Sequence, residues 1–150
     1  MEGHLQDNIV YVEIKLPVYV PFRTQVGVAL SDAEFLDAFR VTVDSFRAEH
    51  TDFIGARVVI VCLRSQPTDE LVAAYRRSVR LKQDFPDYIA GFDTAGPEDS
   101  MPSISTFGRA LHAERLAALD RGVDVPLLLH AGESNDPLNT QIVDAVGMCE

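Results

Sequence analysis

The chain has 150 residues, of which 13 are Lys or Arg, 23 are Asp or Glu and 47% are apolar. This composition is typical of one soluble globular domain. The formal net charge of −10 excludes a duplex-binding surface, which needs clustered Lys and Arg in excess, and it disfavours acidic membranes. The longest uninterrupted apolar stretch, Val58–Leu63, is far shorter than the ~20 residues of a membrane-spanning helix. We therefore expect neither nucleic acid nor a membrane as a partner.

The first residues, MEGHLQDN, have neither the basic start nor the apolar core of a secretory signal. The chain as written therefore predicts no export: either the protein is intracellular or its true N-terminus is missing. The two cysteines, Cys62 and Cys149, lie far apart and form no Cys-X-X-Cys pair, so they predict neither a disulfide framework nor a redox compartment.

Four short apolar runs predict β-strands. They are Ile9–Leu16, Ala56–Leu63, Tyr88–Phe92 and Pro126–His130. The second run is almost wholly apolar, which is typical of a strand buried on both faces of a parallel sheet. The other three are shorter or carry polar residues.

Segments with helical periodicity separate these runs. Ser31 precedes Glu34 by three residues, which predicts a capping box at the start of a helix over residues 31–50. Further helices are expected over residues 69–83, 105–121 and 138–148. Gly122 is a plausible C-cap for the helix over residues 105–121. Asp136 and Pro137 resemble the N-cap and the first residue of the last helix. An irregular stretch, residues 17–30, separates the first strand from the first helix.

The strand-helix alternation predicts an α/β fold with a parallel sheet and right-handed crossovers. Periodicity alone leaves two architectures open, a doubly wound sheet and a (β/α)8 barrel. A barrel typically needs ~250 residues, so four β-α units would make about half of one. A doubly wound binding domain is disfavoured because no Gly-X-Gly-X-X-Gly or phosphate loop follows any of the four runs.

In both architectures the active site lies at the carboxyl ends of the strands. His130 ends the fourth run, and Gly132 permits a turn that brings Glu133 near it. The pair could be a metal ligand beside an acid/base group, or a strand cap followed by a solvated loop. Asp93 directly follows the third run, in a loop that either contacts a flat ligand or is only a turn.

Sequence blocks around these residues resemble a known family. GFDTAGPED and LLLHAGES, in this order and separation, resemble the signatures GFDLAGxE and xxHAGE of the adenosine/AMP deaminase superfamily of zinc hydrolases. DNIVYVEIK with LPVY, HTDFIGARVVIV before LRSQ, and DFPDYIAGFD resemble the branch called adenosine deaminase-related growth factors. The similarity spans most of residues 7–146.

The resemblance implies a (β/α)8 TIM barrel that binds one catalytic Zn²⁺. Residues 9–147 would then be strands two to five with their helices, so residues 1–150 are predicted to form a partial barrel domain. The implied substrate is a purine nucleoside, with adenosine converted to inosine. His130 maps to a zinc ligand, Glu133 to the proton shuttle toward the purine ring nitrogen, and Gly96 to a backbone N–H that binds the base. Zinc activates the attacking water in such enzymes.

Two further residues are expected to contact the substrate. One is Asp93, beside the mapped site, and the other is Glu13, on the first run. For Glu13 an ion pair with Arg57 or Arg64 is an alternative interpretation.

The chain also departs from the family pattern. It contains no His-X-His element, which supplies two zinc ligands in the family, and the remaining Asp ligand and the hydroxide-orienting His belong to strands after the HAGE element. We therefore expect the chain to be an incomplete, inactive part of a deaminase. The alternative is a catalytically dead half-barrel that binds partners and self-associates as a homodimer.

The expected location depends on the branch of the family. Membership of the growth-factor branch would imply an extracellular protein whose signal peptide is missing. Without that membership a cytoplasmic protein is expected.

Overall fold

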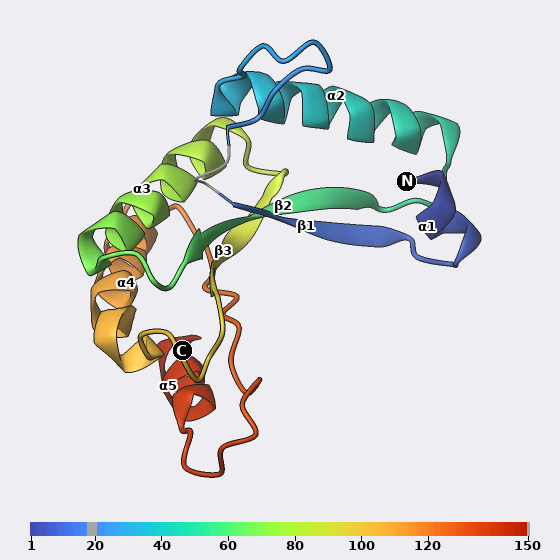
Figure 1. Ribbon diagram of the computed structural model, residues 1–150. Helices are drawn as coiled ribbons and strands as arrows, with labels where there is room; N and C mark the ends of the chain where they lie inside the picture. The colour runs from blue at the N-terminus through green and yellow to red at the C-terminus, as the bar shows by residue number, and fades with distance from the viewer. Residues whose placement is uncertain (18–20, 150) are drawn as a thin grey trace.

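A computed structural model describes residues 1–17 and 21–149 of the chain. Residues 18–20, which include part of the predicted irregular stretch and of the LPVY block, lie outside the described residues. Three parallel strands form one sheet in the order β1-β2-β3, and helices connect them (Figure 1). The strands are β1 (Tyr11–Pro17), β2 (Gly55–Leu63) and β3 (Ile89–Ala95). The helices are α1 (Glu2–Gln6), α2 (Asp32–Glu49), α3 (Thr68–Asp84), α4 (Ile104–Leu119) and α5 (Gln141–Cys149).

The apolar core lies on one face of the sheet. Val58, Ile60 and Cys62 of β2 pack there with Phe92 of β3 and with buried residues of α2, α3, α4 and α5. The opposite face carries the alternating residues of each strand, among them Lys15 on β1, which is level with Val59 on β2. A doubly wound sheet would have helices on both faces. Helices gathered on one face of a sequentially ordered parallel sheet are the arrangement of a barrel wall.

The three observed strands confirm the first three predicted ones, with boundaries shifted by one to three residues. The fourth predicted strand, Pro126–His130, is wrong as a strand: only Leu127 forms a bridge, parallel to Phe92 of β3. Two backbone hydrogen bonds hold it, from Phe92 N–H to the Pro126 carbonyl at 2.9 Å and from Leu128 N–H to the Phe92 carbonyl at 2.8 Å. The pairing of this segment with β3 does not extend beyond these two bonds and the single bridge.

All four predicted helices are present in the predicted order, and the capping box at Ser31 is present with both of its hydrogen bonds. The start of α5 was predicted wrongly. The helix begins at Gln141 rather than after Asp136, because Asn139 Oδ1 accepts the Gln141 N–H at 3.0 Å while Asp136 Oδ1 accepts the Leu138 N–H in a separate turn. The short helix α1 was not predicted.

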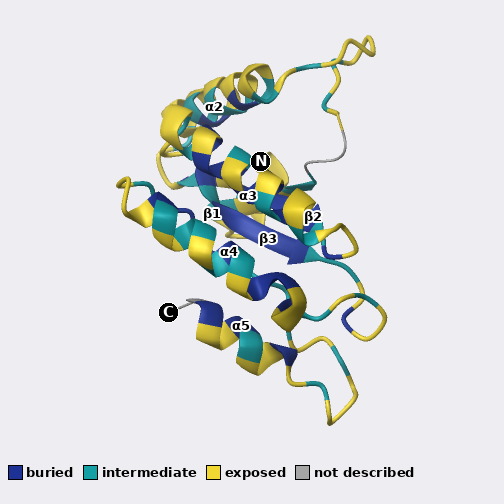
Figure 2. Ribbon diagram, turned by 90° about the vertical axis from the view of Figure 1, so that its left-hand side faces the viewer, coloured by how far each residue is buried: buried dark blue, intermediate teal, exposed yellow. Residues whose placement is uncertain are grey.

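Burial is deepest at β3 and the helix faces turned toward it, whereas the outer helix faces are exposed (Figure 2). Tyr75 of α3 is fully buried, and its ring meets that of Phe92 edge to face with centroids 5.4 Å apart. Its hydroxyl donates a 2.9 Å hydrogen bond to the Val125 carbonyl, and burial raises the pKa of this hydroxyl to about 12. Tyr75 thus ties α3 to the segment that leads into His130.

No helix among the described residues has both the length and the apolar character to cross a lipid bilayer.

Candidate active site at the carboxyl ends of the strands

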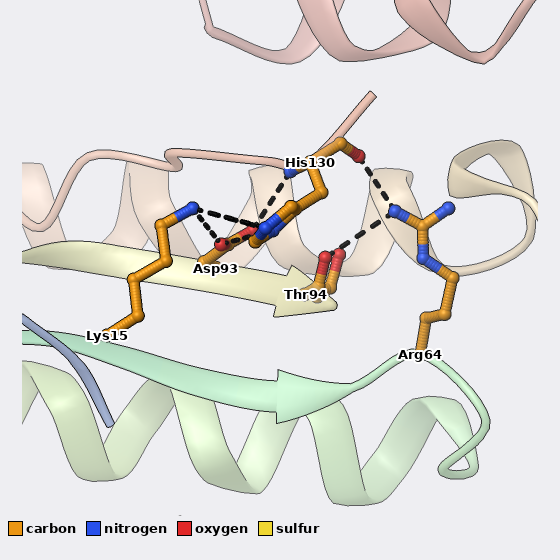
Figure 3. A network of polar contacts seen from close by, with 5 residues as sticks. All are labelled: Lys15, Arg64, Asp93, Thr94 and His130. Atoms are coloured by element: carbon orange, nitrogen blue, oxygen red, sulfur yellow. Dashed lines mark hydrogen bonds and ion pairs between the residues drawn. The ribbon is translucent and has the colours of Figure 1, made fainter. Parts of the chain in front are cut away.

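Asp93 is the centre of a polar network on the helix-free face of the sheet (Figure 3). It lies on β3, level with Val61 of β2, and its side chain is fully buried. Asp93 Oδ2 accepts a 2.8 Å hydrogen bond from Lys15 Nζ, which reaches over from β1. The ammonium group supplies the opposite charge that a buried carboxylate needs.

His130 is held against the same carboxylate at two points. Its backbone N–H donates to Asp93 Oδ1 at 3.0 Å, and its ring Nδ1 lies 2.6 Å from Asp93 Oδ2. Lys15 Nζ also lies 3.4 Å from His130 Nε2. The imidazole remains partly exposed, with 28% of its side-chain surface accessible. A fixed imidazole at the carboxyl edge of the sheet is therefore available to a ligand.

The segment after His130 turns sharply, as predicted. Gly132 has φ +79°, a value that glycine adopts without a steric cost. The Glu133 N–H donates to Glu98 Oε2 at 2.6 Å, and the Gly132 N–H donates to Glu98 Oε1 at 3.3 Å. Glu133 itself is exposed to solvent.

Gly96 follows β3 at the same edge and has φ +136°. A Cβ at this position would lie 2.3 Å from Met101 Sδ and 3.4 Å from Arg64 Cγ. The backbone conformation therefore favours glycine here, and any other residue would also require the Met101 side chain to move. A backbone held in this way can approach a flat ligand closely.

Glu13 lies on β1, opposite Arg57 of β2 in the register. Its carboxylate accepts a 2.8 Å hydrogen bond from the Tyr11 hydroxyl. Neither Arg57 nor Arg64 forms an ion pair with it among the residues that the structure describes. The alternative interpretation of Glu13 as an ion-pair partner is therefore not supported, and its role toward a substrate stays a prediction.

Sequence reasoning missed three residues that build this site: Lys15, Arg64 and Glu98. Arg64 is fully buried at the end of β2, and its Nη2 donates to the His130 carbonyl at 2.7 Å. Glu98 stands in the GFDTAGPED block, but nothing in that block indicates that its carboxylate binds the backbone of residues 132–133. The contacts of Lys15 and Arg64 join residues 66 or more positions apart, and local periodicity carries no signal for such pairs.

The described residues do not fit a catalytic zinc ion by themselves. Such an ion normally has three protein ligands and an open position, and no group of three His, Cys, Asp or Glu residues is placed to hold one within residues 1–17 and 21–149. At His130 the neighbouring carboxylate is already engaged and the ammonium group of Lys15 stands close to the ring. The described residues therefore supply too few ligands to hold a metal ion without further parts of a protein.

Comparison with curated proteins shows similarity to adenosine deaminases. The chain is 34% identical to adenosine deaminase 2-A of Danio rerio over 131 residues, which is 87% of this chain and 25% of that protein. It is 29% identical to adenosine deaminase 2 of Homo sapiens over 153 aligned positions, covering 97% of this chain and 28% of that protein. The chain thus spans about a quarter of the length of these relatives. No family model matches it.

Solved structures show the same fold. Adenine deaminase from Arthrobacter aurescens matches with a TM-score of 0.63 at 19% identity, over 99% of this chain and 39% of that one. An Arabidopsis protein, ADAL in complex with GMP, matches with a TM-score of 0.55 at 23% identity, over 95% of this chain and 39% of that one. The predicted α/β fold is confirmed: the sheet and its helices match part of the deaminase barrel.

Proposed function

The chain belongs to the adenosine deaminase family, and from this premise we propose that it forms strands two to five, with their helices, of a barrel that deaminates adenosine or a related purine nucleoside. The activity belongs to the parent protein. The remaining strands of the barrel and the missing zinc ligands are proposed to come from parts of that protein outside these 150 residues.

One observation carries the proposal. Gly96 directly follows β3, and His130 is held against Asp93 of β3, so the residues that match the two family motifs lie near the carboxyl end of the same strand. Barrel enzymes bind their substrates at the carboxyl ends of their strands. The two motifs are far apart in sequence, and Asp93 joins them through its contacts with the backbone and ring of His130.

We assign a role to each predicted residue within the parent protein. Glu133 protonates the purine ring nitrogen, and its exposed carboxyl group can reach a ligand on the open face. The Gly96 N–H donates a hydrogen bond to the base. His130 offers its imidazole to the zinc ion, which supplies an activated water when bound. Asp93 and Glu13 remain proposed substrate contacts, and Asp93 in addition holds His130.

The test compares four proteins in the presence of Zn²⁺. We expect the parent protein to convert adenosine to inosine, measured by the ultraviolet change, and Glu133→Gln to abolish turnover because the purine ring is no longer protonated. Ser134→Ala, a change beside Glu133, is the matched control and should retain activity. Residues 1–150 alone should show no turnover. A parent protein that leaves adenosine unchanged, or that is unaffected by Glu133→Gln, would contradict the proposal.

A second candidate function is self-association. β1 has a strand on one side only among the described residues, and it carries the exposed side chain of Ile14 near exposed Ile9 and Val10. An unpaired strand edge with apolar residues favours pairing with a second chain. Size-exclusion chromatography of residues 1–150 tests this function. A dimer that Ile14→Lys converts to a monomer would support it, and a monomer at high concentration would refute it.

A further inference from the structure

The backbone of residues 130–133 belongs to no helix or strand, yet side chains bind four of its eight N–H and carbonyl groups. Asp93 accepts the N–H of His130, Arg64 donates to its carbonyl, and Glu98 accepts the next two N–H groups that turn toward the protein. From this geometry we propose that Arg64 and Glu98 are positioning residues, which fix residues 130–133 and thereby the directions of the His130 and Glu133 side chains.

Glu98 accepts backbone hydrogen bonds that a neighbouring strand would accept in a sheet. Its side chain is buried, with 5% exposure, and its two carboxylate oxygens accept separate hydrogen bonds from Gly132 and Glu133. The positive φ of Gly132 turns these successive N–H groups toward one anion, as in backbone nests that bind anions. Hydrogen bonds to an ionised carboxylate are roughly twice as strong as neutral ones. In the described part of the chain Glu98 has no ion-pair partner, so these bonds compensate for its burial.

Arg64 connects the same segment to the rest of the fold. Its Nη2 donates to the His130 carbonyl at 2.7 Å, and its Nη1 donates to Gln141 Oε1 at 3.1 Å. Gln141, the first residue of α5, in turn donates from Nε2 to the Glu98 carbonyl at 2.9 Å. Because a guanidinium group offers several donors in a fixed plane, it can hold both partners at once, which a lysine ammonium does with less geometric control.

The network therefore holds both ends of the segment from the end of β2 and from the loop after β3, and Gln141 at the start of α5 connects the two residues that do so. A catalytic group displaced by about 1 Å can lose on the order of a hundredfold in rate. The consequence for Glu133 as an acid rests on the proposed function. The restraint of the backbone does not, because it follows from the hydrogen bonds alone.

The test is amide hydrogen exchange, measured by NMR on the 150-residue chain and its variants. We expect the Gly132 and Glu133 amides to be protected, and Glu98→Gln to speed their exchange by roughly tenfold or more. The Phe92 amide, bonded to the Pro126 carbonyl, is the internal reference and should keep its protection. Asp99→Asn, a change at an exposed neighbour of Glu98, is the matched control and should leave the exchange rates of the Gly132, Glu133 and Phe92 amides unchanged. Arg64→Lys should move the carbonyl ¹³C resonance of His130.

Three results would overturn the proposal. The first is exchange of the Gly132 and Glu133 amides at unprotected rates in the unaltered chain, including the case in which the chain is unfolded. The second is unchanged exchange in Glu98→Gln. The third is an equal loss of protection at Phe92, which would mean that Glu98 acts only on global stability. Because the experiment uses no nucleoside, its result is independent of whether the parent protein deaminates adenosine.

Discussion

Tyr75→Phe should destabilise the protein through one lost hydrogen bond. The Tyr75 hydroxyl is buried and donates to the Val125 carbonyl at 2.9 Å. Replacing Tyr by Phe removes the donor and leaves the buried carbonyl without this partner, which costs about 1–2 kcal/mol of unfolding free energy. Because Val125 precedes the bridge at Leu127, we expect the loss to loosen the connection between α3 and the segment that bears His130.

The same hydroxyl should make stability fall at alkaline pH. Its pKa is raised from 10.0 to about 12 by burial. Below pH 10.0 both the folded and the unfolded states keep the proton, so the full stability is present. Between pH 10.0 and about 12 the unfolded state releases it while the folded state still binds it, so stability falls as pH rises. The complete loss is roughly 3 kcal/mol.

Urea unfolding at a series of pH values from 7 to about 12 measures both effects. Tyr75→Phe should be less stable than the unaltered chain at pH 7 and should lose less stability between pH 10.0 and about 12. Tyr11→Phe, a change at the start of β1, is the control and should retain most of the alkaline loss. If Tyr75→Phe shows the same alkaline loss as the unaltered chain, the burial argument for Tyr75 is wrong.

Three further changes test the packing around the sheet by urea unfolding. Ser31→Ala should cost about 1 kcal/mol by removing the side-chain cap of α2. Hydrogen bonds from the hydroxyl and the backbone N–H of Ser31 lower the pKa of Glu34, so the stability from this pair is present above pH 4.5 and is lost as pH falls through that lowered pKa. The variant keeps only the backbone hydrogen bond, so its stability should depend less on pH in this range. Gly91→Ala should cost about 1–3 kcal/mol, since its Cβ would lie 2.7 Å from the Pro126 carbonyl oxygen; a cost near zero would mean that the site segment moves away freely. Arg76→Ala, which breaks an exposed pair with Glu114 joining α3 to α4, should cost less than about 1 kcal/mol, and a larger loss would show that this pair is not the weak surface contact that its exposure indicates.

The parts of the fold that local patterns control could be predicted from the sequence. The run of apolar residues in β2 and the Ser31 capping box each depend on neighbours within a few positions, and both were predicted correctly. The prediction of the fourth strand failed because only Leu127 pairs with β3, and an apolar run such as Pro126–His130 does not show how far its pairing with a neighbouring strand extends. Before α5 both Asp136 and Asn139 could accept an N–H at the start of a helix. Only the geometry shows that Asn139 accepts the N–H of the first helical residue, Gln141, whereas Asp136 belongs to a separate turn.

The same distinction between local and distant contacts applies to the candidate site. The motifs identified His130 and the turn at Gly132, because their residue types and spacing are local. Lys15 and Arg64 could not be found, since each acts through contacts with residues far away in the chain. A charged residue near the end of an apolar run usually indicates a solvated position, and burial of Arg64 becomes visible only when α5 and the loop after β3 are in place.

The central claim is that these residues form one edge of a deaminase site, and turnover by the parent protein tests it most directly. Adenosine consumption with Zn²⁺ should be measured for the parent protein and its Glu133→Gln variant, with loss of structure excluded by equal unfolding midpoints. We expect conversion to inosine by the parent and none by the variant. Equal turnover by both proteins, or none by either, would contradict the account.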